Sequence, residues 1–200
     1  PDRDHRVNHH GEGFFVAENG LLVAKIFDAP TSETSVFKDN NIEVFAFSVP
    51  HGPIHGAVGY RIVAGNRSVI ISGDTDLMDD YSFANGVDVL IHEAILEQES
   101  AEISRAAYRV GNDRMGVVFH DIQNYHANLM DYDDQPGLLS RLEGIDIGML
   151  ALIHIIPDED QPIVKRVLRR FKSKSSHETV VVNDNMVMEL PLNSDKIFIK

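Results

Sequence analysis

The chain has 200 residues, of which 43% are hydrophobic and 24% are charged, and this balance is typical of one folded globular domain. The 18 Lys and Arg residues are outnumbered by 31 Asp and Glu residues, so the net charge of −13 excludes a global positive field that would attract a polyanion. The sequence has no Cys, so disulfides and thiolate ligands are excluded, and any metal must be bound by His and carboxylates.

These properties also bear on partners and on the compartment. No apolar run approaches the roughly 20 residues that a membrane span needs. We therefore expect neither a membrane nor a nucleic acid as a partner. We favour the cytoplasm over the periplasm, although a chain without Cys suits both compartments.

Short apolar stretches, many of them β-branched or aromatic and bounded by Gly, Asn, Asp or Pro, predict strands. The predicted strands span residues 13–17, 21–27, 43–49, 57–63, 67–72, 88–92 and 148–154. The pairs Asn19-Gly20 and Gly65-Asn66 predict hairpin turns between neighbouring strands. A terminal hairpin is predicted between residues 180–182 and 186–188.

Helical spacing of apolar residues begins after Glu93. It predicts helices over 97–118, 135–143 and 161–172. The last of these carries a basic face, which we interpret as solvated in preference to a phosphate-contact surface; its residues are Lys165, Arg166, Arg169 and Arg170. Strands first, then alternating strands and helices, predict an α/β layered sandwich.

Four predicted strands are followed by residues suited to metal or acid–base chemistry. His51 follows 43–49, Asp74 follows 67–72, the pair His92-Glu93 follows 88–91, and His154 follows 148–153. Because strands of an α/β sheet release such residues at one edge, the loops there form the usual ligand crevice. Two His and one Asp from separate strands suit Zn²⁺, Mn²⁺ or Fe.

Each of these residues also has a plainer interpretation. A single His after a strand is usually a hydrogen-bonded loop residue, Asp74 could cap a following helix, and His126 could line a loop. His55 lies close to His51 in sequence and is a weak candidate for substrate binding. The histidine-rich start, with His5, His9 and His10, we interpret as a solvated tract. The pattern as a whole carries more weight than any one member.

The sequence resembles the metallo-β-lactamase superfamily, specifically its ribonuclease Z-like and arylsulfatase-like metal-dependent hydrolases. The matching blocks are FSVPHG at 47–52 with AVGYR at 57–61, NRSVIISGDT at 66–75, DVLIHEA at 88–94, YH at 125–126 and LIHIIP at 152–157. The resemblance implies the αββα layered sandwich of this superfamily. It also implies that His51 and His154 are metal ligands, that Asp74 bridges two metal ions, and that Glu93 and His126 assist proton transfer.

The chain departs from the family in its first part. The signature His-x-His-x-Asp-His, which contributes most ligands to the two metals, does not occur in these 200 residues. The chain therefore resembles the C-terminal two-thirds of such an enzyme, as one partial domain over 1–200, which is either processed or incomplete. Two divalent ions are expected in the intact enzyme, Zn²⁺ before Mn²⁺ or Fe, and partial or no metal in this chain. An uncovered sheet face leads us to expect a homodimer.

The resemblance implies hydrolysis by a metal-activated water. In this superfamily, tRNA-processing enzymes commonly carry a long arm before the Ser-Gly-Asp-Thr strand, and only residues 62–66 stand there in this sequence. We therefore expect a small phosphodiester, sulfate ester or related ester as the substrate. Two alternatives stay open, namely a ribonuclease Z-type tRNA 3′-processing endonuclease and a non-catalytic binding or dimerisation module. Ile95 and Ala127 replace residues that the family usually has beside Glu93 and His126.

Overall fold

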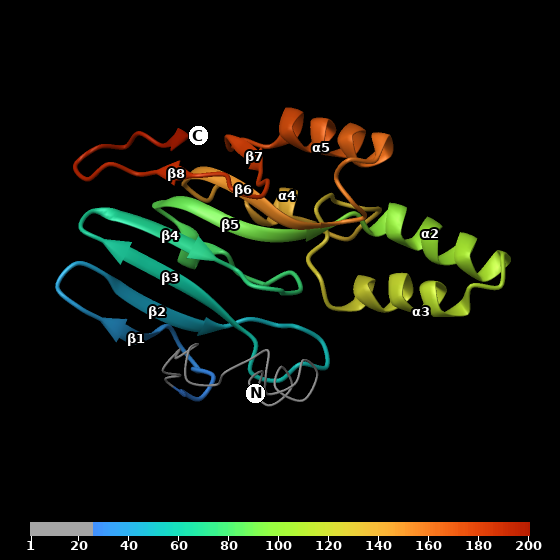
Figure 1. Cartoon of the computed structure of the whole chain (residues 1–200), viewed down its shortest axis with the longest axis horizontal. Coiled ribbons are helices and arrows are strands. Elements are labelled where there is room, and N and C mark those ends of the chain that lie inside the picture. The colour runs from blue at the N-terminus through green and yellow to red at the C-terminus, as the bar shows by residue number, and fades with distance from the viewer. Residues whose placement is uncertain (1–25) are drawn as a thin grey trace, which may run out of the picture.

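The computed structural model describes residues 26–200. The predicted strand 13–17, nearly all of 21–27, the turn at Asn19-Gly20 and the histidine-rich start with His5, His9 and His10 lie outside this range. The main element is a seven-stranded sheet in the order β1-β2-β3-β4-β5-β6-β7 (Figure 1). The strands are β1 (Thr34–Lys38), β2 (Glu43–Ser48), β3 (Val58–Ala64), β4 (Arg67–Ile71), β5 (Val87–Ile95), β6 (Ile147–Ile156) and β7 (Thr179–Val181).

The first four strands form an antiparallel meander. β2 pairs with β3 along its whole length, and β3 and β4 are joined by the predicted two-residue turn, since Ala64 pairs with Arg67 across Gly65-Asn66. Gly65 has φ +59°, a left-handed conformation that glycine adopts without strain. The hairpin prediction at this position is therefore confirmed.

The other half of the sheet is parallel. β4 pairs with β5, β5 with β6, and β6 with β7, each in the parallel direction. The carboxyl ends of β4, β5 and β6 consequently meet at one edge of the sheet. This arrangement brings together the loops that follow Ile71, Ile95 and Ile156.

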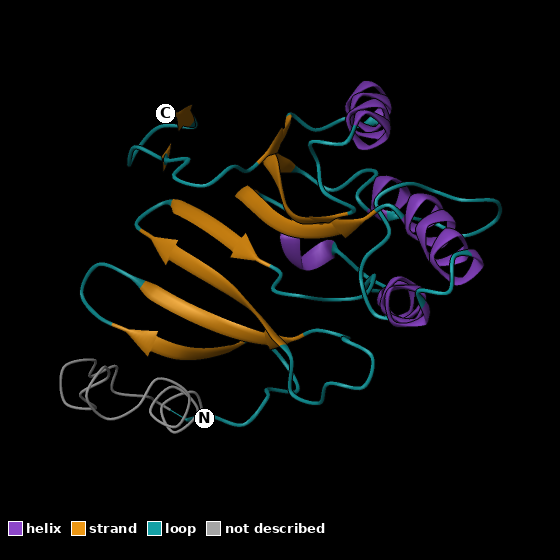
Figure 2. Cartoon of the chain, turned by 45° about the vertical axis from the view of Figure 1, so that its right-hand side comes forward, coloured by secondary structure: helices purple, strands orange, loops and turns teal. Residues whose placement is uncertain are grey.

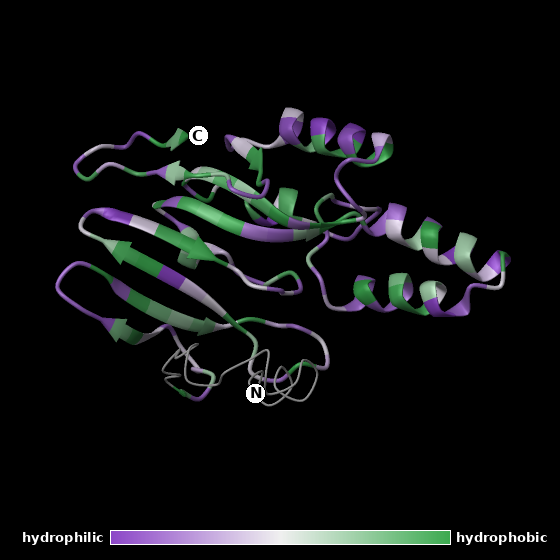
Figure 3. Cartoon of the chain, viewed as in Figure 1, coloured by the Kyte–Doolittle hydropathy of each residue, from purple (hydrophilic) through white to green (hydrophobic). Residues whose placement is uncertain are grey.

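The helices either pack on one face of the sheet or extend beyond one end of it (Figure 2). They are α2 (Glu97–Arg109), α3 (Asp113–Asp121), α4 (Leu138–Arg141) and α5 (Pro162–Lys174), with short 3₁₀ turns η1 (Ser82–Ala84) and η2 (Ile122–Asn124). In α5, Val164, Leu168 and Phe171 pack into the main core, while hydrophilic residues occupy the outer side (Figure 3). This amphipathic pattern confirms the helix predicted at 161–172 and the solvent exposure of its basic residues.

A smaller apolar cluster lies on the opposite face of the sheet. Val89, Met149 and Ala151 form its buried centre. The C-terminal segment packs against it and ends in the two-stranded sheet of β8 (Met188–Glu189) and β9 (Phe198–Ile199). Arg67 fastens this segment, since its guanidinium pairs with Asp88 at 3.1 Å and donates to the carbonyl oxygens of Ser194 and Lys196.

Three sequence predictions need correction. The helix predicted over 97–118 is two helices, because Gly111 adopts φ +73° and the side chain of Asn112 caps the start of α3 by accepting from the amide of Met115. The predicted helix 135–143 is only the four residues of α4. The terminal hairpin is wrong, because β7 joins β6 and β8 pairs with β9.

Two strands, β1 and the two-residue β9, are not predicted from the sequence. β1 lies at the sheet edge and is almost entirely exposed, so its residues show no apolar alternation. No helix among residues 26–200 has the length and apolar character to cross a membrane. The expected homodimer stays a prediction.

Candidate metal centre

The candidate centre lies where β4, β5 and β6 end. Glu93 is near the end of β5, Asp74 lies in the loop after β4, and His154 is near the end of β6. Two loops complete the group, one carrying His51 after β2 and one carrying His126 after η2. The parallel pairing of the three strands is what brings residues so distant in sequence to one edge.

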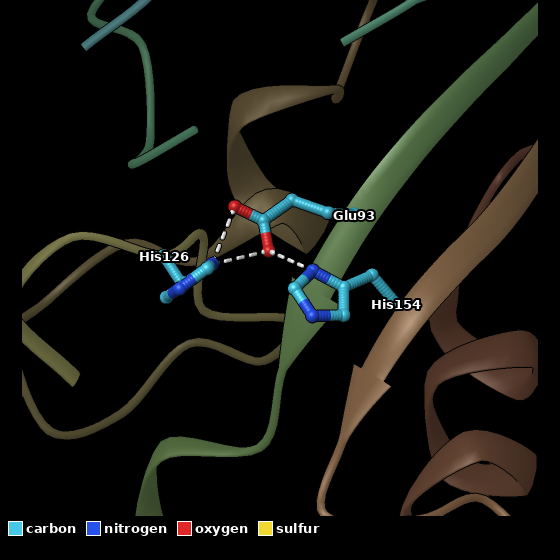
Figure 4. A group of neighbouring side chains, drawn as sticks. All are labelled: Glu93, His126 and His154. Carbon is cyan, nitrogen blue, oxygen red and sulfur yellow. Dashed lines mark hydrogen bonds and ion pairs between the residues drawn. The ribbon is translucent and has the colours of Figure 1, made fainter. Parts of the chain in front are cut away.

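Glu93 and His126 form a buried pair (Figure 4). The Nδ1 atom of His126 lies 2.7 Å from Oε2 and 2.9 Å from Oε1 of Glu93. Glu93 is fully buried, and its Oε1 also accepts a hydrogen bond from the backbone amide of Thr75 at 2.5 Å. Because a carboxylate only accepts, His126 must carry its proton on Nδ1 when neutral, which leaves its Nε2 available for chemistry.

The pair changes the protonation of the imidazole. Burial disfavours the charged ring of His126, but the hydrogen bond and the negative charge of Glu93, with smaller contributions from Asp74 and Asp76, outweigh burial and raise its pKa. The raised pKa favours the protonated ring, which is the form of His126 that can donate a proton.

His154 lies between two carboxylates. Its Nδ1 atom is 3.0 Å from Oδ1 of Asp74 and 3.7 Å from Oε2 of Glu93. The His154 side chain is half-exposed, as is that of Asp74, so this part of the centre opens to solvent. The ring of His154 also meets the ring of His126 edge-on, with centroids 5.4 Å apart.

His51 is held by the main chain of Tyr125. The carbonyl oxygen of Tyr125 lies 2.9 Å from Nδ1 of His51, and because a carbonyl only accepts, Nδ1 is the donor. The ring of His51 packs edge-on against those of Tyr125 and His126, with centroids 5.5 Å and 5.1 Å apart. The Nε2 atom of His51 has no partner among residues 26–200.

This donor set fits a divalent cation. Glu93, His126 and His154 each offer a ligand atom, and these three atoms lie within 4.8 Å of one another. Asp74 adds a carboxylate, and no Lys or Arg within residues 26–200 pairs with any of these side chains. Imidazole nitrogen with carboxylate oxygen is the ligand chemistry of Zn²⁺, Mn²⁺ and Fe. The ligand atoms of Glu93, His126 and His154 are thus close enough to one another for such an ion, and Asp74 reaches the same place through its contact with His154.

His92, next to Glu93, has a structural role. It is fully buried, its Nδ1 donates to the carbonyl of Glu93 at 2.6 Å, and its Nε2 lies 3.0 Å from the hydroxyl of Tyr81. Burial lowers the pKa of His92 to about 4 and raises that of the Tyr81 phenol. Both groups are therefore neutral at pH 7, and the hydroxyl donates to the imidazole.

Besides His92, six residues are candidates from sequence, and the structure brings five of them to one place. His51, Asp74, Glu93, His126 and His154 are linked by the contacts above, whereas His55 is exposed in the 51–57 loop and contacts none of them. Their individual roles in metal binding and proton transfer stay predictions.

Three further residues support the centre and were not predicted. Thr75 fixes Glu93 through its amide, Tyr125 fixes His51 through its carbonyl, and Asp76 adds negative charge while its amide donates to the carbonyl of Pro50 at 2.7 Å. The contacts of Thr75 and Tyr125 are made by backbone atoms, so the type of side chain at these positions gives no indication of them. The position of Asp76, two residues after Asp74, was the one signal available.

No model of a known protein family matches the chain, and no curated protein sequence matches it. Among solved structures, the metallo-β-lactamase fold protein YhfI from Bacillus subtilis matches with a TM-score of 0.50 and 17% identity, over 79% of this chain and 52% of YhfI. Zn²⁺-bound PqqB from Methylobacterium extorquens matches with a TM-score of 0.48 and 20% identity, over 76% of this chain and 48% of PqqB.

The short form of human tRNase Z matches with a TM-score of 0.42 and 19% identity, over 80% of this chain and 47% of tRNase Z. The chain thus spans about half the length of these structures. At such identities the likeness concerns the fold alone. On the strength of the match to YhfI, the chain has the metallo-β-lactamase fold.

Proposed function

We propose that this chain carries part of the active site of a metal-dependent hydrolase. The proposal rests chiefly on one observation, which is that the buried Glu93–His126 pair directly adjoins the His154–Asp74 pair. A structural ion pair would explain either contact alone. A proton-transfer pair beside a cation-binding pair is the combination that hydrolysis by an activated water requires.

In this proposal, Asp74 and His154 hold a divalent ion together with His51. Glu93 is the less suitable ligand, because it is fully buried and its two oxygens already accept from His126 and from Thr75. A bound divalent ion supplies Lewis acidity and lowers the pKa of a coordinated water. Zn²⁺ is favoured, with Mn²⁺ and Fe as alternatives.

The chain's own residues would handle the proton. Glu93 keeps the Nδ1 proton of His126 in place and orients the ring, so that Nε2 is the atom that exchanges a proton with the substrate. The raised pKa of His126 favours the protonated ring, which can then protonate the leaving oxygen of an ester. Tyr125 orients His51 in the same manner through a main-chain oxygen.

The substrate class follows from size and charge. The chain carries a net charge of −13, and the described turn between β3 and β4 has two residues, so no arm for gripping a large polyanion stands there. We propose a small phosphodiester, sulfate ester or related ester as substrate. The solved structure of tRNase Z keeps tRNA processing as the alternative, and a non-catalytic module is the alternative if no metal binds.

The test compares hydrolysis of bis(p-nitrophenyl) phosphate, an aryl sulfate and a tRNA precursor, with Zn²⁺ or Mn²⁺ and with a chelator. We expect weak or no turnover by this chain alone, and chelator-sensitive turnover of a small ester by a longer chain that also carries the missing His-x-His-x-Asp-His ligands, with a fall of about 10²–10⁴-fold in the His126→Asn variant of that longer chain. His120→Asn, at an exposed position on α3, serves as the control and should match the wild type. Turnover that survives the chelator would contradict the requirement for a metal. A preference for the tRNA precursor would contradict the proposed small-ester substrate.

A further inference from the structure

Strand β6 has one residue more than its partner β5 at the level of the candidate centre. Glu93 pairs with Ile153 and Ala94 pairs with Ile155, so His154 lies between two rungs of the ladder without a partner of its own. His154 also has φ +46°, in the left-handed region. Such an extra residue is a β-bulge.

The bulge changes the face to which the following side chains belong. Before it, Leu150 and Leu152 pack in the main core with the helices, whereas Met149 and Ala151 belong to the cluster on the opposite face. After it, Ile155 is again in the main core, although strict alternation would have placed it on the other face.

Strict alternation would also have placed His154 elsewhere. It would have followed Leu150 and Leu152 into the core beneath the helices. Glu93 belongs to the other face, because its neighbour Ala94 is in the helix-side core. The bulge therefore turns His154 towards the face of Glu93, where its Nδ1 lies 3.7 Å from Glu93 and 3.0 Å from Asp74.

The left-handed conformation makes this arrangement unfavourable for a residue with a side chain. In residues 26–200, three other non-glycine residues have positive φ, namely Asp133, Asn185 and Asn193, and all three lie in turns. Asp and Asn tolerate this conformation because their short side chains bond locally. Within the described strands, His154 alone adopts it.

We infer that the bulge at Ile153 and His154 is a positioning device, which turns His154 out of the helix-packed core and into the candidate metal centre at the expense of folding stability. The role of the bulge in metal binding rests on the proposed function, whereas the strain rests on the backbone conformation of His154 alone. If the bulge served packing only, no imidazole would be needed at position 154, and replacing His154 would leave metal binding unchanged.

The strain is tested by comparing His154→Gly with His154→Ala in urea unfolding. Glycine accepts φ +46° freely, so His154→Gly should have an unfolding equilibrium constant about tenfold lower than His154→Ala. Thr34, exposed on β1 with ordinary strand geometry, gives the control pair, in which glycine should be less stable than alanine. If the glycine variant is less stable than the alanine variant at position 154 as well as at position 34, the claim that His154 is strained is refuted.

The purpose is tested by the rise in Tm that Zn²⁺ produces. The wild type should gain stability, and His154→Gly should bind Zn²⁺ more than about tenfold more weakly. A double variant, Ile153→His with His154→Gly, moves the imidazole by one residue and should not restore binding. Full binding by His154→Gly, or restoration by the double variant, would overturn the positioning role. A wild type that binds no Zn²⁺, Mn²⁺ or Fe²⁺ would instead refute the proposed function, and with it the purpose of the bulge.

Discussion

The backbone amide of Thr75 donates to Oε1 of Glu93 at 2.5 Å, and this contact joins the loop after β4 to the end of β5. Because Asp74 precedes Thr75, the same contact holds the backbone beside Asp74 close to the end of β5. The centre is thus built on main-chain contacts between strand ends as much as on its candidate ligands.

Gly52 is expected to be essential for the position of His51. Its φ is +46°, and a Cβ atom there would lie 2.5 Å from Cβ of Tyr125, whose carbonyl holds His51. Gly52→Ala should therefore unfold at lower urea than the wild type and bind Zn²⁺ more weakly. Gly56→Ala is the matched control, because Gly56 also has positive φ but its Cβ would meet only Ala29 at 3.7 Å. Equal metal affinity in the two variants would contradict this role of Gly52.

His92 should make stability depend on pH. Its pKa is lowered from 6.5 to about 4 in the folded chain, so between these values the unfolded chain binds a proton that the folded chain excludes. The stabilisation is fully present above about pH 6.5 and is lost as the pH falls towards 4. Between pH 7 and pH 5, the free energy of unfolding that His92 contributes should fall by about 2 kcal/mol. Urea unfolding of His92→Gln should show a smaller difference in unfolding free energy between pH 7 and pH 5 than the wild type shows. An unchanged difference would refute this role of His92.

Asp76 should strengthen cation binding through its charge. It lies two residues from Asp74, and its negative charge contributes to the raised pKa of His126. Asp76→Asn should weaken Zn²⁺ binding by roughly fivefold, since nearby charges at a partly solvated site interact by about 1 kcal/mol or more. Asp79→Asn, at a fully exposed acidic residue three positions later, should leave the affinity unchanged. Calorimetric titration at low salt measures both, and equal losses would indicate a general effect of net charge.

Much of the fold was accessible from sequence, because the inner strands leave short, mostly apolar runs bounded by turn residues. The runs at 43–49, 57–63, 67–72, 88–92 and 148–154 correspond to β2 to β6. The exposed edge strand β1 and the chain's path after β7 were not accessible, since edge pairing depends on tertiary contacts that leave no periodicity. The break at Gly111 was visible as a glycine but was outweighed by the helical spacing around it.

The candidate centre was likewise predictable only in part. The positions of Asp74 and His154 at strand ends predicted that they would be near each other, because parallel strands release such residues at one edge. The bulge at His154 could not be predicted, because nothing in Leu152-Ile153-His154-Ile155 distinguishes an extra residue from regular alternation. The main-chain contacts of Thr75 and Tyr125 were hidden for the same reason.

The most direct test of the account is to locate a bound ion. Crystals of the chain soaked in Zn²⁺ should show an anomalous scattering peak about 2.0–2.2 Å from the nearest side-chain atoms of His154 and Asp74, and the peak should disappear in His154→Asn. A peak only at other sites, or no peak at millimolar Zn²⁺, would contradict the claim that this cluster is a metal centre.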